Sequence, residues 1–435
     1  MSCLTYTPKK DCFDSHEELP TDDNVITSIL QNKFDRNDFT NHFLCLVDQI
    51  DYPCTIAIDG QWGSGKTFFV KQAKTILECC NPYITTRKNP KIQKQFQVCI
   101  SDTYLPIYFD AWANDNTTDP LLSIIHTIAT DEKVLKEDFF EKQAPFLKKL
   151  ASFVDALWDK GLTDFYNHKE PSDILKTVKD SKGIEEDILS FLDECKYEKA
   201  NKIVLFIDEL DRCKPSFAVR LLERIKHFFS VEDLIVVLSI NSAELIHTIK
   251  ACYGQGFDSD RYLDRFFDYR LVLPQINTKK YLESIKFDKS LCLYSVLEAV
   301  IDHFNLSVRE IERLCRAINV VSGKPANREK VARFSPWGTL FYSVFAPVIL
   351  GLKITNKELF QAFIQGNDSA PLLGLWDNYD SVRKDFKKLL TPFGSEIDSR
   401  DAVEALYKNF FSQKPGILEL FFELINMLSS FASYH

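Results

Sequence analysis

Gly60-Gln61-Trp62-Gly63-Ser64-Gly65-Lys66-Thr67 is the stretch that decides the fold of this 435-residue chain. Its glycines let the backbone turn its amide groups inward, around the oxygens of a phosphate group. The lysine can reach the outer phosphates of a nucleotide, and the threonine after it can offer a hydroxyl to a magnesium ion. The spacing predicts a P-loop, a motif that needs a strand before it and a helix after it.

The sequence around this loop has the required pattern. Cys54–Asp59 is a short apolar run typical of a buried strand, and a helix is expected from about 65 to 79. Four further apolar runs alternate with helical stretches: Tyr104–Trp112, Lys202–Asp208, Asp233–Asn241 and Tyr269–Pro274. Buried strands that alternate with helices predict an α/β fold with a parallel central sheet.

The rest of the chain predicts helices and sets the expected domain limits. Ser307 and Glu310 form a capping box at the start of one of these helices. We expect a helical N-terminal extension at 1–50, a P-loop domain at 51–275 with a helical insertion at about 117–200, and a helical C-terminal domain at 276–435.

The net charge of −9 and the pI of about 5.5 disfavour a broad nucleic-acid surface, although a local basic groove stays possible. The 12 cysteines include no Cys-x-x-Cys pair, and the N-terminus lacks the features of a secretory signal. These observations predict reduced thiols and a cytoplasmic location.

One apolar stretch, Trp337–Leu352, resembles a membrane span at first sight. It covers only about 16 residues and contains Pro347, whereas a spanning helix needs roughly 20 residues. A buried helix or a hairpin of helices is therefore expected there, and no transmembrane segment.

Two acidic residues follow the third predicted strand, in Ile207-Asp208-Glu209-Leu210-Asp211-Arg212. A carboxylate at the end of a buried strand is costly unless it meets a cation. Asp208 is therefore expected to hold magnesium together with Thr67. Glu209, one residue on, is expected to be the base that orients and polarises an attacking water molecule.

Two further sets of residues are candidates with open alternatives. Asn241, at the end of its strand, would bind the attacking water or the outer phosphate, or would cap the next helix. Arg261, Arg265 and Arg270 would supply a cation to the outer phosphate of a neighbouring subunit, or would form surface ion pairs. Similarly, Arg309 and Arg313 would sense nucleotide or lie on a solvated helix face.

Taken together, the motifs resemble the KAP family of P-loop NTPases over about residues 50–320. The matching pieces are Gly60–Phe68, Phe109–Trp112, Val204–Pro215, Leu221–Phe229, Tyr262–Phe267 and Leu273–Pro274. The resemblance implies the additional-strand type of P-loop fold, as in AAA+ and STAND-like proteins, with an extra strand between the two Walker strands. It also implies ATP and Mg²⁺ as ligands, with the nucleotide on Gly60, Gln61, Trp62, Gly63, Ser64, Gly65, Lys66, Thr67 and Phe68.

The resemblance extends to partners and biology. The run Leu263–Asp268 looks like the arginine-finger region of AAA+ proteins, which favours Arg265. Bacterial KAP proteins are often linked to phage exclusion, and some act with partner subunits. This chain departs from the family twice. Segment 117–200 has no apolar run of roughly 18 residues, where many members carry transmembrane helices. Asn241 stands where the family usually has aspartate.

The expected function is a cytoplasmic ATPase in a bacterial antiphage defence system. It would act as a homo-oligomer or in a complex with a partner protein encoded nearby. Glu209 and Lys66 would carry the chemistry, with Asn241 and Arg265 assisting. A low-turnover nucleotide-switched scaffold for an effector is the first alternative, and the presence of Glu209 favours turnover over it. A P-loop kinase is the second, and the absence of a basic cluster in the insertion disfavours it.

Overall fold

The computed structural model of the chain describes residues 19–85, 88–96, 100–117, 119–134, 143–150, 186–197, 199–229, 231–288, 292–323, 338, 340–390 and 399–412. These residues form two compact units. The first is Leu19–Gln275, and the second consists of the described residues from Ile276 onward.

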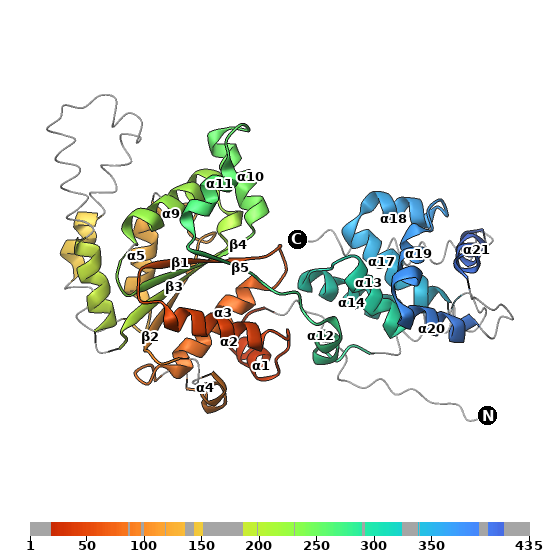
Figure 1. The fold of residues 1–435 in the computed structure, drawn as a ribbon, viewed down its shortest axis with the longest axis horizontal. Helices are drawn as coiled ribbons and strands as arrows, with labels where there is room; N and C mark the ends of the chain where they lie inside the picture. The colour runs from red at the N-terminus through yellow and green to blue at the C-terminus, as the bar shows by residue number, and fades with distance from the viewer. Residues whose placement is uncertain are drawn as a thin grey trace. The chain divides into compact units, whose positions relative to one another are not determined.

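Within the described residues, a parallel five-stranded sheet forms the centre of the first unit (Figure 1). Its strands are β1 (Cys54–Asp59), β2 (Tyr104–Asp110), β3 (Lys202–Asp208), β4 (Leu234–Ile240) and β5 (Tyr269–Val272). Their order is β2-β3-β4-β1-β5, and each neighbouring pair is parallel. β4 thus lies between the strand that precedes the P-loop and the strand that ends at Asp208. This extra strand confirms the predicted fold class.

Helices cover both faces of this sheet (Figure 1). All residues of β3 and β4 are buried, as expected for central parallel strands. One face packs against α1 (Asp22–Leu30), α2 (Asn37–Gln49), α3 (Lys66–Cys80) and α4 (Pro90–Phe96). The other packs against α5 (Pro120–Thr130), α9 (Pro215–Phe228), α10 (Ser242–Tyr253) and α11 (Ser259–Leu263).

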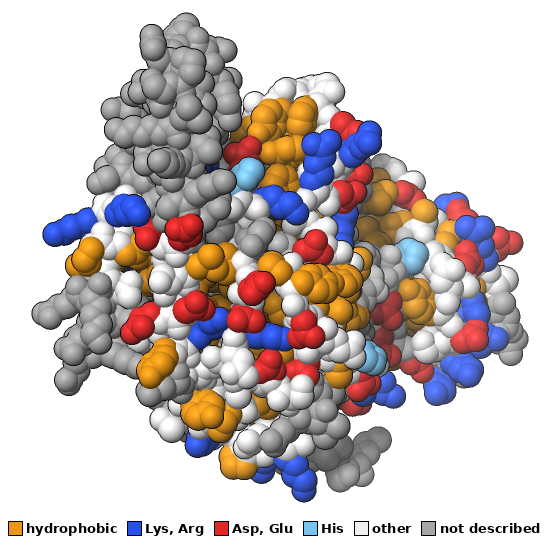
Figure 2. All heavy atoms as spheres, turned by 60° about the vertical axis from the view of Figure 1, so that its left-hand side comes forward, with side chains coloured by type: hydrophobic (Ala, Val, Ile, Leu, Met, Phe, Trp, Pro, Cys, Tyr) orange, Lys and Arg blue, Asp and Glu red, His pale blue; other side chains and the backbone are white. Residues whose placement is uncertain are grey.

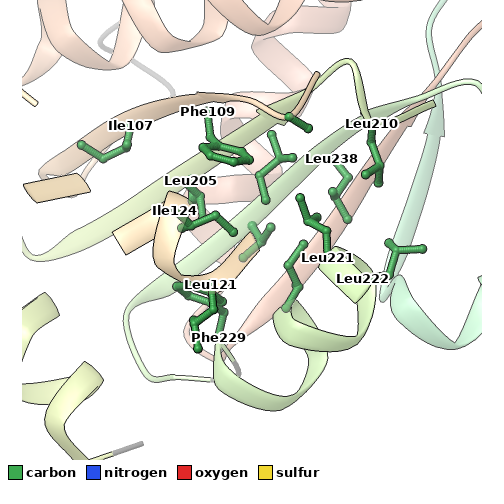
Figure 3. Close-up of a cluster of buried hydrophobic side chains, with 14 of the residues drawn as sticks. Ile107, Phe109, Leu121, Ile124, Leu205, Leu210, Leu221, Leu222, Phe229 and Leu238 are labelled. Atoms are coloured by element: carbon green, nitrogen blue, oxygen red, sulfur yellow. The ribbon is translucent and has the colours of Figure 1, made fainter. Parts of the chain in front are cut away.

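Figure 3 shows part of the second of these layers. Phe109 of β2 and Leu205 of β3 lie among Leu121 and Ile124 of α5 and Leu221 of α9, and all five are fully buried. Each such side chain stabilises the fold by about 1.5–3 kcal/mol. The packed layer holds the carboxyl ends of the strands together at one edge of the sheet.

The second strand of the sheet is shorter than expected. The predicted strand Tyr104–Trp112 ends earlier, at Asp110, because the Asp110 side chain accepts a hydrogen bond from the N–H of Ala113 (2.9 Å) and turns the chain. The helical insertion at about 117–200 is described only in part, by α5 and by helical residues 143–150 and 186–196. Residues 151–185 lie outside the described part.

In the second unit, the described elements are helical. They are α12 (Thr278–Ser284), α13 (Tyr294–His303), α14 (Val308–Gly323), the π-helical turn η4 (Phe341–Phe345), α17 (Ala346–Thr355), α18 (Lys357–Ile364), α19 (Ala370–Asn378), α20 (Asp380–Leu390) and α21 (Arg400–Phe411). The capping box is confirmed, because Glu310 accepts from the N–H of Ser307 (2.8 Å) and Ser307 accepts from that of Glu310 (3.4 Å).

The apolar stretch that ends at Leu352 is buried inside the second unit, as predicted. Its described part is η4 followed by α17, and Ala346–Leu352 are all buried. Trp337 lies outside the described residues. No helix in the described part of the chain combines the length and the apolar character that crossing a membrane requires.

Candidate functional site

The P-loop connects the carboxyl end of β1 to the first turn of α3. Gly60 donates its N–H to the carbonyl of Ile240 at the end of β4 (3.0 Å), which anchors the loop to the sheet. A Cβ atom at Gly60 would lie 2.8 Å from Oγ of Ser64. Gly63 and Gly65 have φ angles of 75° and 92°, in the left-handed region that favours glycine. The loop thereby leads into the positive end of α3, a ready site for an anion.

Lys66 and Thr67 lie in the first turn of α3. The ammonium of Lys66 donates to the carbonyl oxygens of Gly60 (2.7 Å) and Gln61 (3.2 Å) of its own loop. Burial lowers the pKa of Lys66, and nearby carboxylates oppose that effect. The positive charge is thus held across the loop by neutral oxygens, which a phosphate could replace.

Asp208 ends β3 and Glu209 follows it, and β3 lies beside β4, which in turn lies beside β1. Asp208 is only 1% exposed, and it accepts hydrogen bonds from the hydroxyl of Tyr108 (3.1 Å) and the N–H of Glu209 (2.9 Å). Glu209 has a φ of 61°, an uncommon conformation for a residue other than glycine. The hydroxyl of Thr67 lies 3.5 Å from Oε1 of Glu209. The P-loop side and the acidic run that begins at Asp208 therefore meet at Thr67 and Glu209.

The electrostatics around Glu209 set its protonation. Burial, and then the neighbouring Asp208 carboxylate, raise the pKa of Glu209 to about 6, while Arg212 lowers it. The Arg212 Nε lies 2.6 Å from Oε2 of Glu209. A carboxyl group with this pKa is mostly ionised at neutral pH and is close to the range in which a general base is most effective.

The donor atoms at this point fit a magnesium ion. Thr67 supplies a hydroxyl and Asp208 a buried carboxylate, and Mg²⁺ typically takes one or two carboxylates plus the phosphates of a substrate. Among the described residues, no group of three His, Cys, Asp or Glu side chains is arranged to hold a metal ion by itself. Thr67 and Asp208 are the residues that would hold a magnesium ion at this point.

Asn241 follows β4 and directly precedes α10, and its side chain forms no capping hydrogen bond to that helix. Asp59 caps the helix instead, because its carboxylate accepts from the N–H (3.0 Å) and the hydroxyl (2.7 Å) of Ser242. Ile240 pairs in register with Asp59, so Asn241 lies beside the start of the P-loop. The capping alternative for its side chain is therefore not used.

The three arginines before and in β5 have different surroundings. Arg270 donates to Asp59 (2.8 Å) and to the hydroxyl of Ser242 (2.5 Å) within its own chain. Burial alone would raise the pKa of Asp59, but its bonds to Ser242 and Arg270 lower it. Arg261 and Arg265 instead line a shallow pocket of about 230 Å³ with Phe257, Asp258 and Tyr262.

The two arginines expected in the C-terminal domain, Arg309 and Arg313, lie on α14 of the second unit.

Basic and acidic side chains are interspersed on the molecular face in Figure 2. Among the described residues drawn there, no single sign of charge dominates that face.

Two residues outside the P-loop, Arg36 and Asp211, contact it and were not predicted from the sequence. Arg36, just before α2, is only 4% exposed, and its guanidinium donates to the carbonyl oxygens of Ser64 (2.8 Å) and Pro274. Trp62 donates its indole N–H to Asp211. Asp211 belongs to the same acidic run as Asp208, so the sequence offered a signal for it. No motif distinguishes Arg36 from other arginines.

A profile described as the KAP family P-loop domain matches residues 36–323. Among solved structures, the chain is similar to the Aeropyrum pernix ORC1 protein in complex with DNA, with 13% identity and a TM-score of 0.34 over 96% of this chain and 85% of that one. No curated protein sequence matches. The strand order and the match over residues 36–323 both identify a P-loop fold.

Proposed function

Since the chain belongs to the KAP family of P-loop NTPases, we propose that it binds ATP with Mg²⁺ and hydrolyses it. One observation carries this proposal. The start of α3, with Lys66 and Thr67, meets the end of β3, with Asp208 and Glu209. Phosphoryl transfer to water requires loop amides and a helix N-terminus that bind the phosphates. It also requires a cation that stabilises their charge and a carboxylate base.

In this proposal each side chain has one role. Lys66 leaves the carbonyl oxygens of its own loop and binds the outer phosphates. Thr67 and Asp208 hold Mg²⁺, which when bound neutralises charge on the phosphate oxygens. Glu209 accepts a hydrogen bond from the attacking water molecule and takes its proton. Asn241 orients that water or the outer phosphate from the end of β4.

Arg265 is proposed to act across a subunit interface. It is exposed, and it lies in the short turn η3 (Asp264–Phe266) that leads to β5. Arg270 is engaged with Asp59 in its own chain and is therefore less suited to that role. This assignment requires a homo-oligomer, or a partner subunit encoded nearby, for full activity.

The biological setting we propose, a cytoplasmic component of a bacterial antiphage defence system, rests on the family resemblance alone. Its test is phage plating on cells that express the wild-type protein, together with its genomic neighbours, or a Lys66→Ala variant. Protection that depends on Lys66 supports the proposal. Equal plaque counts with and without the wild-type protein would rule out a defence role under those conditions.

A nucleotide-switched scaffold with low turnover is the second candidate, and one observation favours it. Arg212 pairs with Glu209 and could restrain the base. Full biological function of a Glu209→Gln variant would identify the scaffold. A phosphorylated acceptor in place of free phosphate would instead identify a kinase.

The direct test measures phosphate release from Mg·ATP by the purified chain, together with its native mass with and without ATP. The Lys66→Ala variant is expected to lose phosphate release and any ATP-dependent assembly. Lys74→Ala, on the same helix, serves as the control because Lys74 pairs with Glu78. Unchanged assembly and phosphate release in Lys66→Ala would overturn the proposal.

A further inference from the structure

Arg36 is a buried cation held by neutral main-chain oxygens. Its guanidinium donates to the carbonyl oxygens of Ser64 and Pro274, and its Nε meets no hydrogen-bond partner in the part of the chain that the structure describes. No acidic side chain among the described residues pairs with it, and burial lowers its pKa to about 10. Burying a charge without a counter-ion costs free energy of folding, so we expect this arginine to have a role that offsets the cost.

The position of the Ser64 oxygen indicates that role. A trans peptide is planar, so the carbonyl of Ser64 and the N–H of Gly65 point in opposite directions. Arg36 binds this carbonyl at 2.8 Å, which fixes the plane of the peptide and directs the N–H of Gly65 to the opposite side. Gly65 is the residue that immediately precedes α3, in the left-handed conformation. The amide that Arg36 orients is therefore one of those available to a phosphate.

The other end of the guanidinium holds the segment that leaves β5. Pro274 follows Leu273, whose N–H donates to the carbonyl of Asp59 (2.8 Å), the residue before Gly60. The end of β5 is thus tied to both sides of the P-loop, through Asp59 on one side and through Arg36 and Ser64 on the other.

We propose that Arg36 is a positioning residue for nucleotide binding, which sets the Ser64–Gly65 peptide for the phosphates and couples its state to the end of β5. This inference rests on the proposed function, since it presumes that the loop binds nucleotide. Because coupling between two sites is reciprocal, nucleotide in the loop stabilises the hydrogen bonds at the end of β5 as much as those bonds favour the nucleotide.

The test compares Arg36→Met with Lys202→Met as a matched control. Lys202 is also a buried cation that binds a main-chain oxygen, that of Ile50 (2.9 Å), but it lies at the start of β3, at the opposite end of the strands from the P-loop. The readouts are the Kd of Mg·ATP by calorimetry, the Tm, and hydrogen exchange of amides in 269–275 with and without Mg·ATP.

Both variants are expected to lower the Tm. Arg36→Met weakens Mg·ATP binding by about 10- to 100-fold, as expected for the loss of a charge-assisted hydrogen bond. It also abolishes the slowing of exchange at 269–275 that nucleotide causes in the wild-type protein. Lys202→Met keeps the wild-type Kd and the exchange response. Arg36→Lys retains charge but lacks the planar fork, so it recovers Tm more than it recovers the exchange response.

The outcomes separate the two proposals. If the wild-type protein does not bind Mg·ATP, the proposed function fails, and this inference fails with it. If the wild-type protein binds but Arg36→Met or Arg36→Lys has the same Kd and exchange response, only the inference is overturned. An equal loss of affinity in Lys202→Met would likewise overturn it, because the effect would then follow from stability alone.

Discussion

Glu209 and Arg212 form an ion pair in which Nε of Arg212 lies 2.6 Å from Oε2 of Glu209. The other carboxylate oxygen of Glu209 faces the hydroxyl of Thr67 at 3.5 Å. The guanidinium carbon of Arg212 lies 5.6 Å from the centre of the Trp112 ring, so the arginine is itself held in place. The pair fixes one oxygen of Glu209 and leaves the other directed toward the start of α3.

Replacing Arg212 is expected to impair turnover more than binding. Arg212→Gln removes the contact that orients Glu209, and small misplacements of a catalytic group lower the rate by about 10- to 100-fold. Single-turnover phosphate release should fall by that factor, while the Kd of Mg·ATP stays close to the wild-type value. Arg400→Gln, which removes an exposed ion pair with Asp377 (3.4 Å), is the control. A faster rate in Arg212→Gln would mean that the pair restrains the base.

Replacing Glu209 tests its assignment as the base. Glu209→Gln keeps the size of the side chain and its hydrogen bond to Thr67 but cannot take a proton. We expect phosphate release to fall by about 10²- to 10⁴-fold, the usual contribution of a general base. Calorimetry should show that Mg·ATP still binds. Glu232→Gln, an exposed substitution just before β4, should leave both measurements unchanged. A Glu209→Gln enzyme with wild-type turnover would remove Glu209 from the mechanism.

The proposed role of Arg265 across an interface predicts complementation between two inactive variants. Arg265→Ala retains its own Glu209, and Glu209→Gln retains Arg265 for a neighbour. Each alone should hydrolyse ATP slowly, because a missing arginine finger lowers the rate by about 10³- to 10⁵-fold. A mixture of the two should regain activity through sites that combine Glu209 of one subunit with Arg265 of the other.

The control for this mixture is Arg261→Ala combined with Glu209→Gln, since Arg261 lines the same shallow pocket. If Arg261→Ala is the variant that is complemented, the finger is Arg261 and not Arg265. If neither mixture exceeds the sum of its parts, no arginine in this pocket acts on a neighbouring subunit.

Asp48 predicts how the stability of the first unit depends on pH. Its carboxylate accepts hydrogen bonds from the N–H of Ser101 (3.0 Å), the N–H of Asp102 (3.2 Å) and the hydroxyl of Tyr104 (2.8 Å). Burial would raise the pKa of Asp48, but bonds to Ser101, Tyr104 and Asp102 outweigh it and lower the pKa below its ordinary value of 3.8. In acid the unfolded chain therefore binds a proton more readily than the folded one.

It follows that this stabilisation is complete at any pH well above the ordinary pKa and is lost as the pH falls through the folded pKa. Asp48→Asn should lower the Tm at pH 7 by about 2–6 °C, through weaker hydrogen bonds. The gap between wild type and variant should shrink in acid, as measured by thermal unfolding from pH 7 to pH 3. Asp193→Asn, which removes an exposed partner of Lys196, is the control. A gap that stays constant with pH would contradict the assignment.

The sequence by itself determined the elements of the nucleotide site. The spacing of Gly60, Gly65 and Lys66 has few structural solutions, because a tight turn, a helix start and a cation must follow one another in the chain. Apolar runs such as Lys202–Asp208 predicted buried parallel strands, since both faces of such strands must be covered. These features depend on residues that are close together in the chain, so they can be predicted from the sequence.

The tertiary structure alone decided which distant residues meet the loop. Asp59 caps α10 in place of Asn241, and Arg270 binds Asp59, because the register of β1 with β4 and β5 brings these residues together. Arg36 reaches Ser64, 28 residues away, and Pro274, 238 residues away, and no periodicity encodes such pairings. They follow from the packing of the sheet and its helices. The sequence therefore predicted the P-loop, but it did not predict the long-range contacts that fix the conformation of the loop.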